Sequence, residues 1–131
     1  MYKVYLIGVY DSNNNLRTIK IGQTTQTVKA RLHDIQKYAN KSKASYNKGR
    51  HEILAYAEID GINAGVIIED TTHKIITARY KTINKCKGAK DYFTVYHNIS
   101  EQTIIKRFKA CVINAVNIKN KIVFSDDNIQ G

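Results

Sequence analysis

The chain has 131 residues and a formal net charge of +10, which fits one basic globular domain large enough to bury a core. Hydrophobic residues make up 43% and charged residues 24%, the proportions of an ordinary soluble protein. No apolar run approaches the roughly 18 residues of a membrane span, no signal-peptide block is present, and Cys86 and Cys111 lack metal-ligand spacing. We therefore expect a cytoplasmic protein with reduced thiols, one of them buried on a helix, and no membrane partner.

The excess of cations is the most informative bulk property. Lys and Arg number 21 against 11 Asp and Glu, so the chain carries a positive field that attracts polyanions such as nucleic acid. Frequent Lys, Asn and Ile also arise from an AT-rich genome without any nucleic-acid function. Charge alone leaves both interpretations open.

A hairpin is expected at the start of the chain. Residues 2–10 and 16–22 are rich in β-branched and aromatic residues, which favours two strands. The Asp and Asn residues between them are typical of a turn. A turn centred near Asn13 places Lys20 about opposite Leu6.

A helix and a third strand follow the hairpin. Apolar residues recur every three or four positions from Thr27 to about Ala39, which predicts a helix capped by a threonine. Residues 40–50 are polar and basic, which is typical of a loop. His51–Ile59 alternates enough to predict the third strand.

The next periodic segment predicts a second helix from about Ile62 to Tyr80. Its three- and four-residue steps place Ile62, Val66, Glu69 and His73 on one face. Glu69 follows three apolar residues in a helix that otherwise faces the core. Such a carboxylate is hard to explain as an ordinary solvent-exposed residue.

The C-terminal third predicts a loop, a short strand and a third helix. Residues 81–90 are rich in lysine and are expected to form the loop, and Asp91–Tyr96 the strand. Ser100 is the expected N-cap of the helix. The apolar stripe of that helix comprises Ile104, Phe108, Cys111 and Ala115. No element is predicted for the end of the chain.

This order defines the expected fold class as α/β, with a small three-stranded, mainly antiparallel sheet flanked by helices. Without repeats, prolines or linkers, residues 1–120 are expected to form a single domain and residues 121–131 a C-terminal tail.

The order of the motifs resembles a known family. A tyrosine strand, a turn, the Lys-Ile-Gly segment at residues 20–22 and a helix carrying Arg31 resemble the GIY-YIG nuclease superfamily, in particular its T5orf172-like branch. Glu69 and the segment Asp91-Tyr92-Phe93 match two further motifs in the right order. The resemblance spans residues 2–96 and implies a β-β-α-β-α-α fold with GIY-YIG-type endonuclease activity.

The resemblance also implies roles for individual residues. Tyr5 would activate or orient the attacking water, and Lys20, where many members carry a second tyrosine, would lower the pKa of the nearby phenol. Gly22 would let the strand end and the helix begin. Arg31 would clamp the phosphate, and Glu69 would bind Mg²⁺ or Mn²⁺, which neutralises charge on the phosphate and helps the leaving oxygen.

The identity of the catalytic tyrosine stays open between two residues. Tyr10, in Gly8-Val9-Tyr10, is the more literal match to the family's first motif, but the geometry of the hairpin favours Tyr5.

A second open question concerns helix-borne side chains. Family members often carry His or Tyr one turn beyond the arginine, where this chain has Ile35. The function of that His or Tyr is either lost in this chain or supplied by His33 or Tyr38. His73 resembles a histidine common in this branch, and is a further candidate.

Each candidate also has an ordinary structural explanation. Tyr5 is then a packed strand aromatic, and Glu69 with His73 an i, i+4 pair that stabilises a helix by about 0.2–0.5 kcal/mol. The basic loop is then a flexible solvated segment, although such a loop beside a cleft is a natural contact for a nucleic-acid backbone. Its candidate binding residues are Lys41, Lys43, Lys48 and Arg50.

The ordered set favours a metal-dependent endonuclease that hydrolyses phosphodiester bonds in DNA. The alternative on the same fold is a catalytically weak or inactive nucleic-acid-binding or regulatory module; a basic protein–protein interaction domain is a third possibility. Target specificity is expected to be low, or to come from a homodimer or a partner protein. The resemblance also suggests a phage or mobile-element protein acting in a bacterial or phage-infected cell.

Overall fold

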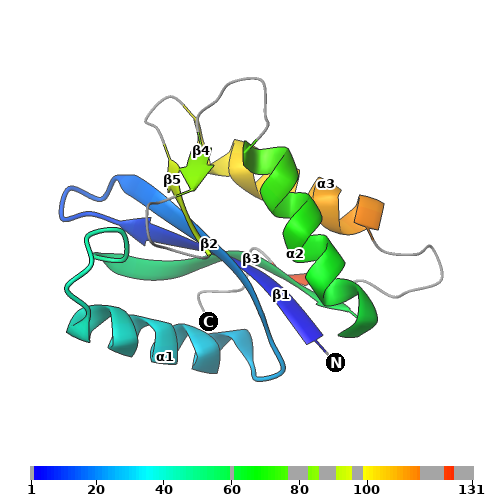
Figure 1. The fold of residues 1–131 in the computed structure, drawn as a ribbon, viewed down its shortest axis with the longest axis horizontal. Helices are drawn as coiled ribbons and strands as arrows, with labels where there is room; N and C mark the ends of the chain where they lie inside the picture. Colours follow the sequence, from blue (N-terminus) through cyan, green and yellow to red (C-terminus); the bar gives the residue numbers. More distant parts are fainter. Residues whose placement is uncertain are drawn as a thin grey trace.

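The computed structural model describes residues 2–59, 61–76, 83–85, 91–95, 99–115 and 123–125. Its strands pair antiparallel in one sheet, in the order β4-β5-β2-β1-β3-β6 (Figure 1). The strands are β1 (Tyr2–Tyr10), β2 (Leu16–Thr24), β3 (Arg50–Ile59), β4 (Ile83–Lys85), β5 (Tyr92–Val95) and β6 (Val123–Ser125). The helices are α1 (Val28–Lys41), α2 (Gly61–Ile76) and α3 (Glu101–Ala115).

The β1–β2 hairpin turns where the sequence predicts it. Asp11 accepts hydrogen bonds from the backbone N–H groups of Asn13 and Asn15, each at 2.9 Å. Asn14 takes the left-handed conformation, with φ of 64°, which asparagine tolerates better than most residues. A carboxylate and an asparagine thus supply the chemistry that reverses the chain.

The helices cover opposite faces of the sheet. Figure 1 shows α1 on one side and α2 with α3 on the other. Helix α1 begins as predicted at a threonine cap, because Thr27 Oγ1 accepts from the Ala30 N–H at 3.2 Å. Ser100 caps α3 in the same way, accepting from the Thr103 N–H at 3.2 Å.

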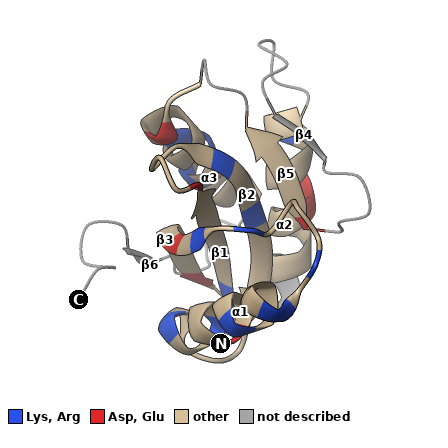
Figure 2. Cartoon of the chain, turned by 90° about the vertical axis from the view of Figure 1, so that its left-hand side faces the viewer, with Lys and Arg blue, Asp and Glu red and all other residues tan. Residues whose placement is uncertain are grey.

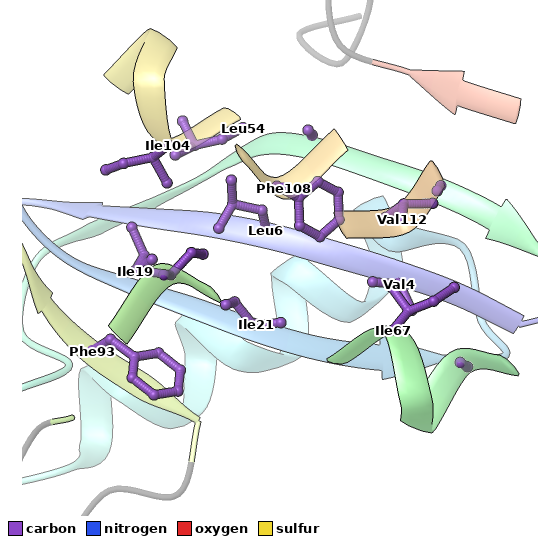
Figure 3. Packing of buried hydrophobic residues seen from close by; sticks show 14 of the residues in the cluster. Val4, Leu6, Ile19, Ile21, Leu54, Ile67, Phe93, Ile104, Phe108 and Val112 are labelled. Carbon is purple, nitrogen blue, oxygen red and sulfur yellow. The ribbon is translucent and has the colours of Figure 1, made fainter. Parts of the chain in front are cut away.

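The larger apolar core lies between the sheet and the pair α2 and α3. Figure 3 shows side chains of β1 and β2 pointing toward Ile67 of α2 and Phe108 of α3. On α3 the predicted stripe is confirmed at three of its residues, Ile104, Phe108 and Cys111, which are all buried. Cys111 is a free thiol. Cys86 and the expected end of the second helix lie outside the described residues.

The α/β class with an antiparallel sheet flanked by helices is confirmed, but the sheet is wider than expected. The short strand predicted at residues 91–96 is present as β5, and it pairs with β2 and so extends the sheet on that side. Two additional three-residue strands were not predicted. β4 pairs with β5 inside residues 81–90, which the sequence interpretation assigned to a loop. β6 pairs with β3 inside residues 121–131, which it assigned to a tail. Strands of three residues carry too little periodicity to be recognised without their partners.

Candidate functional site

The register of the hairpin decides which side chains share a face. Tyr5 pairs with Gly22 and Ile7 pairs with Lys20, so Tyr5 and Lys20 both point toward the face covered by α1. The predicted pairing of residue 20 with residue 6 is therefore wrong by one position. The β-bulge between Val9 and Tyr10 accounts for the shift, since it adds a residue to one strand.

Gly22 makes room for the ring of Tyr5. A Cβ atom at position 22 would lie 2.3 Å from Tyr5 Oη and 2.5 Å from its Cζ. The strand continues through Gly22 to Thr24, so the expectation that the glycine ends the strand is wrong. Its lack of a side chain instead lets the phenol cross the β2 backbone.

Arg31 is the cation that meets Tyr5. It lies in the first turn of α1, and its guanidinium is close enough to the Tyr5 hydroxyl to influence the pKa of the phenol. Burial raises the pKa of Tyr5, whereas hydrogen bonding by Arg31 and its positive charge lower it by less. The expectation that a neighbouring lysine brings the phenol toward its ionised form is therefore not met, since desolvation outweighs the nearby cation.

Lys20 is held between an acid and an aromatic ring. Its Nζ lies 3.5 Å from Asp91 Oδ2 and 4.7 Å from the centroid of the Tyr92 ring. Only 8% of Lys20 is exposed. Burial lowers its pKa, and the Asp91 carboxylate partly restores it. Lys20 is thus a largely desolvated cation, which strengthens its attraction to a phosphate.

Behind this pair lies a buried histidine. His51 Nδ1 is 3.1 Å from the Gly49 carbonyl oxygen, so this nitrogen carries the proton. Its Nε2 then accepts from the Tyr92 hydroxyl at 3.1 Å. Burial lowers the pKa of His51 and raises that of Tyr92. The neutral imidazole fixes the ring over which Lys20 lies.

Lys20, Arg31, Asp91 and Tyr92 border a cavity of about 480 Å³, which we name the aromatic cavity. It lies between α1, the loop that follows α1, the middle of β2 and the start of β5. Figure 2 shows basic segments on α1 and β2. Its lining residues are Lys20, Arg31, Asp34, Ile35, Tyr38, Tyr46, Asn47, Asp91 and Tyr92. Tyr5, only 2% exposed, is not one of them.

A second cavity, of about 540 Å³, contains Glu69 and is named the glutamate cavity. Residues Val66, Glu69 and His73 are exposed, so the predicted shared face of α2 is open, while Ala64, Ile67, Thr71 and Ile75 face the core. Asp70, Asp91 and His73 also line this cavity. Asp91 therefore borders both cavities and joins them.

Tyr10 lies on the other face of the sheet. Its hydroxyl donates to the Glu101 carboxylate of α3, and the Arg50 guanidinium lies 4.9 Å from its ring centroid. Arg50 also contacts Glu52 and Asn14. The structure thus groups Tyr5, and not Tyr10, with Lys20 and Arg31, and it separates Arg50 from the other basic candidates.

The remaining candidates occupy exposed positions. Lys41 ends α1, and Lys43 and Lys48 lie in the loop that follows it. His33 is exposed on α1, whereas Tyr38, the other proposed substitute for the missing side chain, lines the aromatic cavity.

Sequence reasoning missed Tyr46, Asn47 and His51. The first two lie in a loop whose composition indicates only basic character, and the alternation of β3 identifies His51 only as a strand residue. A lone aromatic in an otherwise polar, glycine-containing loop was the available signal for Tyr46. No local pattern identifies His51, because its role depends on Tyr92, which is 41 residues away.

The carboxylates of the glutamate cavity fit a hard divalent cation. Across the described residues no three His, Cys, Asp or Glu side chains cluster as a metal cage. Mg²⁺ needs no such cage, since it commonly keeps several waters and takes one or two carboxylates together with substrate phosphates. Glu69, with Asp70 and Asp91 lining the same cavity, offers such oxygen ligands.

The fold and these cavities can be compared with known proteins. A family model described as T5orf172 domain matches residues 3–112, most of the chain. The chain therefore belongs to the T5orf172 domain family, which is related to the GIY-YIG nucleases, and the expected branch is confirmed. Membership indicates a nuclease-like or DNA-binding module.

Two other findings complete the comparison. No curated protein and no solved structure matches the chain. Among the helices that the structure describes, none has the length and apolar character required to cross a bilayer.

Proposed function

We propose that the chain is a metal-dependent endonuclease that hydrolyses phosphodiester bonds in DNA. The observation that carries the proposal is the convergence of Lys20 and Arg31, from different elements, on one cavity. The guanidinium of Arg31 influences the pKa of the buried Tyr5 hydroxyl, and a carboxylate-lined cavity adjoins through Asp91. A net charge of +10 favours a polyanionic substrate.

Arg31 and Lys20 are proposed to bind the scissile phosphate. The planar guanidinium can donate two parallel hydrogen bonds to phosphate oxygens, which fixes their orientation. The ammonium of Lys20 adds a compact second charge, and a phosphate would replace its 3.5 Å partner, Asp91. The loop residues Lys41, Lys43 and Lys48 are proposed to contact flanking phosphates.

Tyr5 is proposed to orient the attacking water and, as phenolate, to take its proton. Water adds to phosphorus, the bond to the leaving sugar oxygen breaks, and that oxygen takes a proton from solvent water, while the Tyr5 phenol later returns its proton to solvent. Because burial raises the pKa of Tyr5, only a small fraction is ionised near neutrality. The proposal therefore predicts a cleavage rate that rises with pH, by up to about tenfold per pH unit. In Tyr5→Phe this dependence of the rate on pH should be lost.

Glu69 is proposed to hold Mg²⁺ or Mn²⁺, with waters and with help from Asp91. Such an ion, when bound, neutralises charge on the phosphate and on the leaving oxygen. Because Glu69 is exposed, the bound ion would have room for its other ligands, which are waters and phosphate oxygens. A catalytic ion requires such open positions, whereas a structural ion does not.

The direct test is nicking of supercoiled plasmid with Mg²⁺ or with Mn²⁺. Glu69→Gln keeps the shape of the side chain but removes its charge, and should lower cleavage by at least about 100-fold if the ion is essential. Glu52→Gln, an exposed glutamate on β3, is the matched control and should cleave like the wild type. Absence of nicking in both metals, or equal activity of Glu69→Gln and wild type, contradicts the proposal.

A second candidate function is a regulatory or DNA-binding module without catalysis. It is favoured by the burial of Tyr5 and by Ile35, which lines the aromatic cavity where family members often carry His or Tyr. Such a module binds DNA in EDTA with undiminished affinity in Glu69→Gln and never nicks. In either case we propose action on DNA within a bacterial or phage-infected cell, with specificity supplied by a second copy or by a partner protein.

A further inference from the structure

The aromatic cavity has three tyrosine walls from three elements. Tyr38 comes from α1, Tyr46 from the following loop and Tyr92 from β5. The Tyr46 and Tyr92 ring centroids lie 5.1 Å apart, with an angle of 53° between the ring planes. Tyr38 is 73% exposed, which is unusual for a large aromatic side chain. A half-open wall of aromatic faces offers a stacking surface.

The loop that carries Tyr46 is fixed by its backbone. Gly49 has a φ of 134°, and a Cβ there would lie 2.2 Å from the Tyr10 carbonyl oxygen. The Thr18 hydroxyl donates to the Tyr46 carbonyl at 3.0 Å, and Gln36 Nε2 donates to the Gly49 carbonyl at 3.1 Å. The tyrosine is therefore held at the cavity.

The polar groups of the cavity suit a nucleotide. Lys20 and Arg31 supply cations, while Asp34 and Asp91 are acceptors. Asn47 is 2% exposed, and its Oδ1 has no hydrogen-bond partner within the part of the chain that the structure describes. An unsatisfied buried acceptor is unfavourable, and the N–H groups of a nucleobase are donors that could satisfy it.

We propose that the aromatic cavity binds one unpaired nucleobase of the DNA strand, beside the phosphate held by Arg31 and Lys20. This inference rests on the proposed function, since it takes that phosphate position as given. A base stacked in a duplex has no free face for the tyrosines, so the nucleotide must be single-stranded or extruded. The substrate class is thus DNA with unpaired nucleotides, such as a single strand, flap or bubble.

The proposal is tested by binding in EDTA, where cleavage does not interfere. Fluorescence anisotropy would compare a single-stranded oligonucleotide, the same strand with one abasic site moved along it, and the matched duplex. We expect the single strand to bind best, and an abasic site at one position to weaken binding on the order of 10-fold. Equal affinity for all three DNAs overturns the proposal.

Tyr38→Ala is the first variant, because its exposed ring can be removed without disturbing the core. It should weaken single-strand binding on the order of 10-fold and leave duplex binding unchanged. Tyr2→Ala, at a tyrosine on β1 outside the cavity, is the matched control. If Tyr38→Ala lost the same affinity for single strand and duplex, the proposal that the aromatic cavity binds an unpaired base would be overturned.

The outcomes separate this proposal from the nuclease proposal. Preference for unpaired nucleotides without nicking in either metal supports the pocket and rejects the enzyme. Nicking that depends on Glu69, with no effect of the abasic site, rejects the pocket and supports the enzyme.

Discussion

The two faces of the sheet differ in what they bury. The face under α2 and α3 is almost wholly apolar, with Leu6, Ile21 and Phe108 excluded from water. The face under α1 buries Tyr5, Lys20 and His51, along with a smaller apolar cluster. Burying polar groups costs free energy unless they are paired, so the first face is suited to stability and the second to chemistry.

The largest effect is expected from the apolar face. Phe108→Ala removes a fully buried ring and should lower the free energy of unfolding by about 3–5 kcal/mol. Denaturant unfolding at 25 °C measures this change. The specific cleavage rate of the remaining folded protein should be nearly unchanged. A loss of activity without a loss of stability would contradict the division between the faces.

The next largest change in stability is expected at the contact between Gly22 and Tyr5. Gly22→Ala places a methyl group 2.3 Å from the phenol oxygen, so the ring must move, at a cost of about 1–3 kcal/mol in unfolding free energy. Gly65→Ala on α2 is the control: its Cβ meets nothing within 4 Å, and it should stabilise the helix by about 0.5–1 kcal/mol. Urea unfolding should therefore show a lower unfolding free energy for Gly22→Ala and a higher one for Gly65→Ala. Equal changes in the two variants would contradict the close packing of Tyr5 against Gly22.

A smaller effect involves His51 and Tyr92. Tyr92→Phe removes the donor at 3.1 Å and should lower the unfolding free energy by about 0.5–1.5 kcal/mol. Burial lowers the pKa of His51 from its ordinary 6.5, so below pH 6.5 the unfolded chain binds a proton that the folded chain does not. Wild-type stability should therefore fall as the pH drops from 6.5 toward the folded pKa, and His51→Gln should remove this decline. Parallel pH curves for the two proteins would exclude the buried neutral histidine.

The smallest change in stability is expected for Lys20→Met. It removes both the ion pair with Asp91 and the cost of burying a charge, so the unfolding free energy should change by less than about 1 kcal/mol at neutral pH. Because burial lowers the pKa of Lys20 from 10.5, wild-type stability should rise with pH between the folded pKa and 10.5, a rise absent in the variant. DNA binding should nevertheless weaken, whereas Lys37→Met, at an exposed residue of α1, is the control. A large loss of stability with normal DNA binding would contradict the view that the face under α1 serves chemistry rather than stability.

Local patterns were enough to predict the elements that carry the site. The Asp and Asn turn, the Thr27 cap and the apolar repeat of α3 are all encoded within a few residues. The register of the hairpin was not predictable to one residue, because the bulge next to Val9 and Tyr10 is a feature of the β1–β2 pairing that no local sequence pattern specifies. Such a slip changes the face on which every later side chain lies.

Sequence motifs identify some candidate residues of the site, but neither its loop residues nor its electrostatics. The order of motifs selects Tyr5, Lys20, Arg31 and Glu69 as candidates and identifies Asp91-Tyr92-Phe93 as a further motif segment. The partner of each was missed, since burial and long-range pairing determine that Arg31 meets Tyr5 and that Lys20 meets Asp91. The sign of the Tyr5 pKa shift followed from burial, which composition cannot supply.

If the glutamate cavity binds a cation as proposed, the position of Asp91 would link the two cavities thermodynamically. Its carboxylate borders both and is the ion-pair partner of Lys20. A cation that draws Asp91 toward the glutamate cavity loosens its hold on Lys20, and an anion that takes Lys20 frees Asp91 for a cation. Each ligand should then raise the affinity for the other by the same factor, as reciprocity of binding free energies requires. The aspartate would make the metal and the strand cooperative ligands of one site.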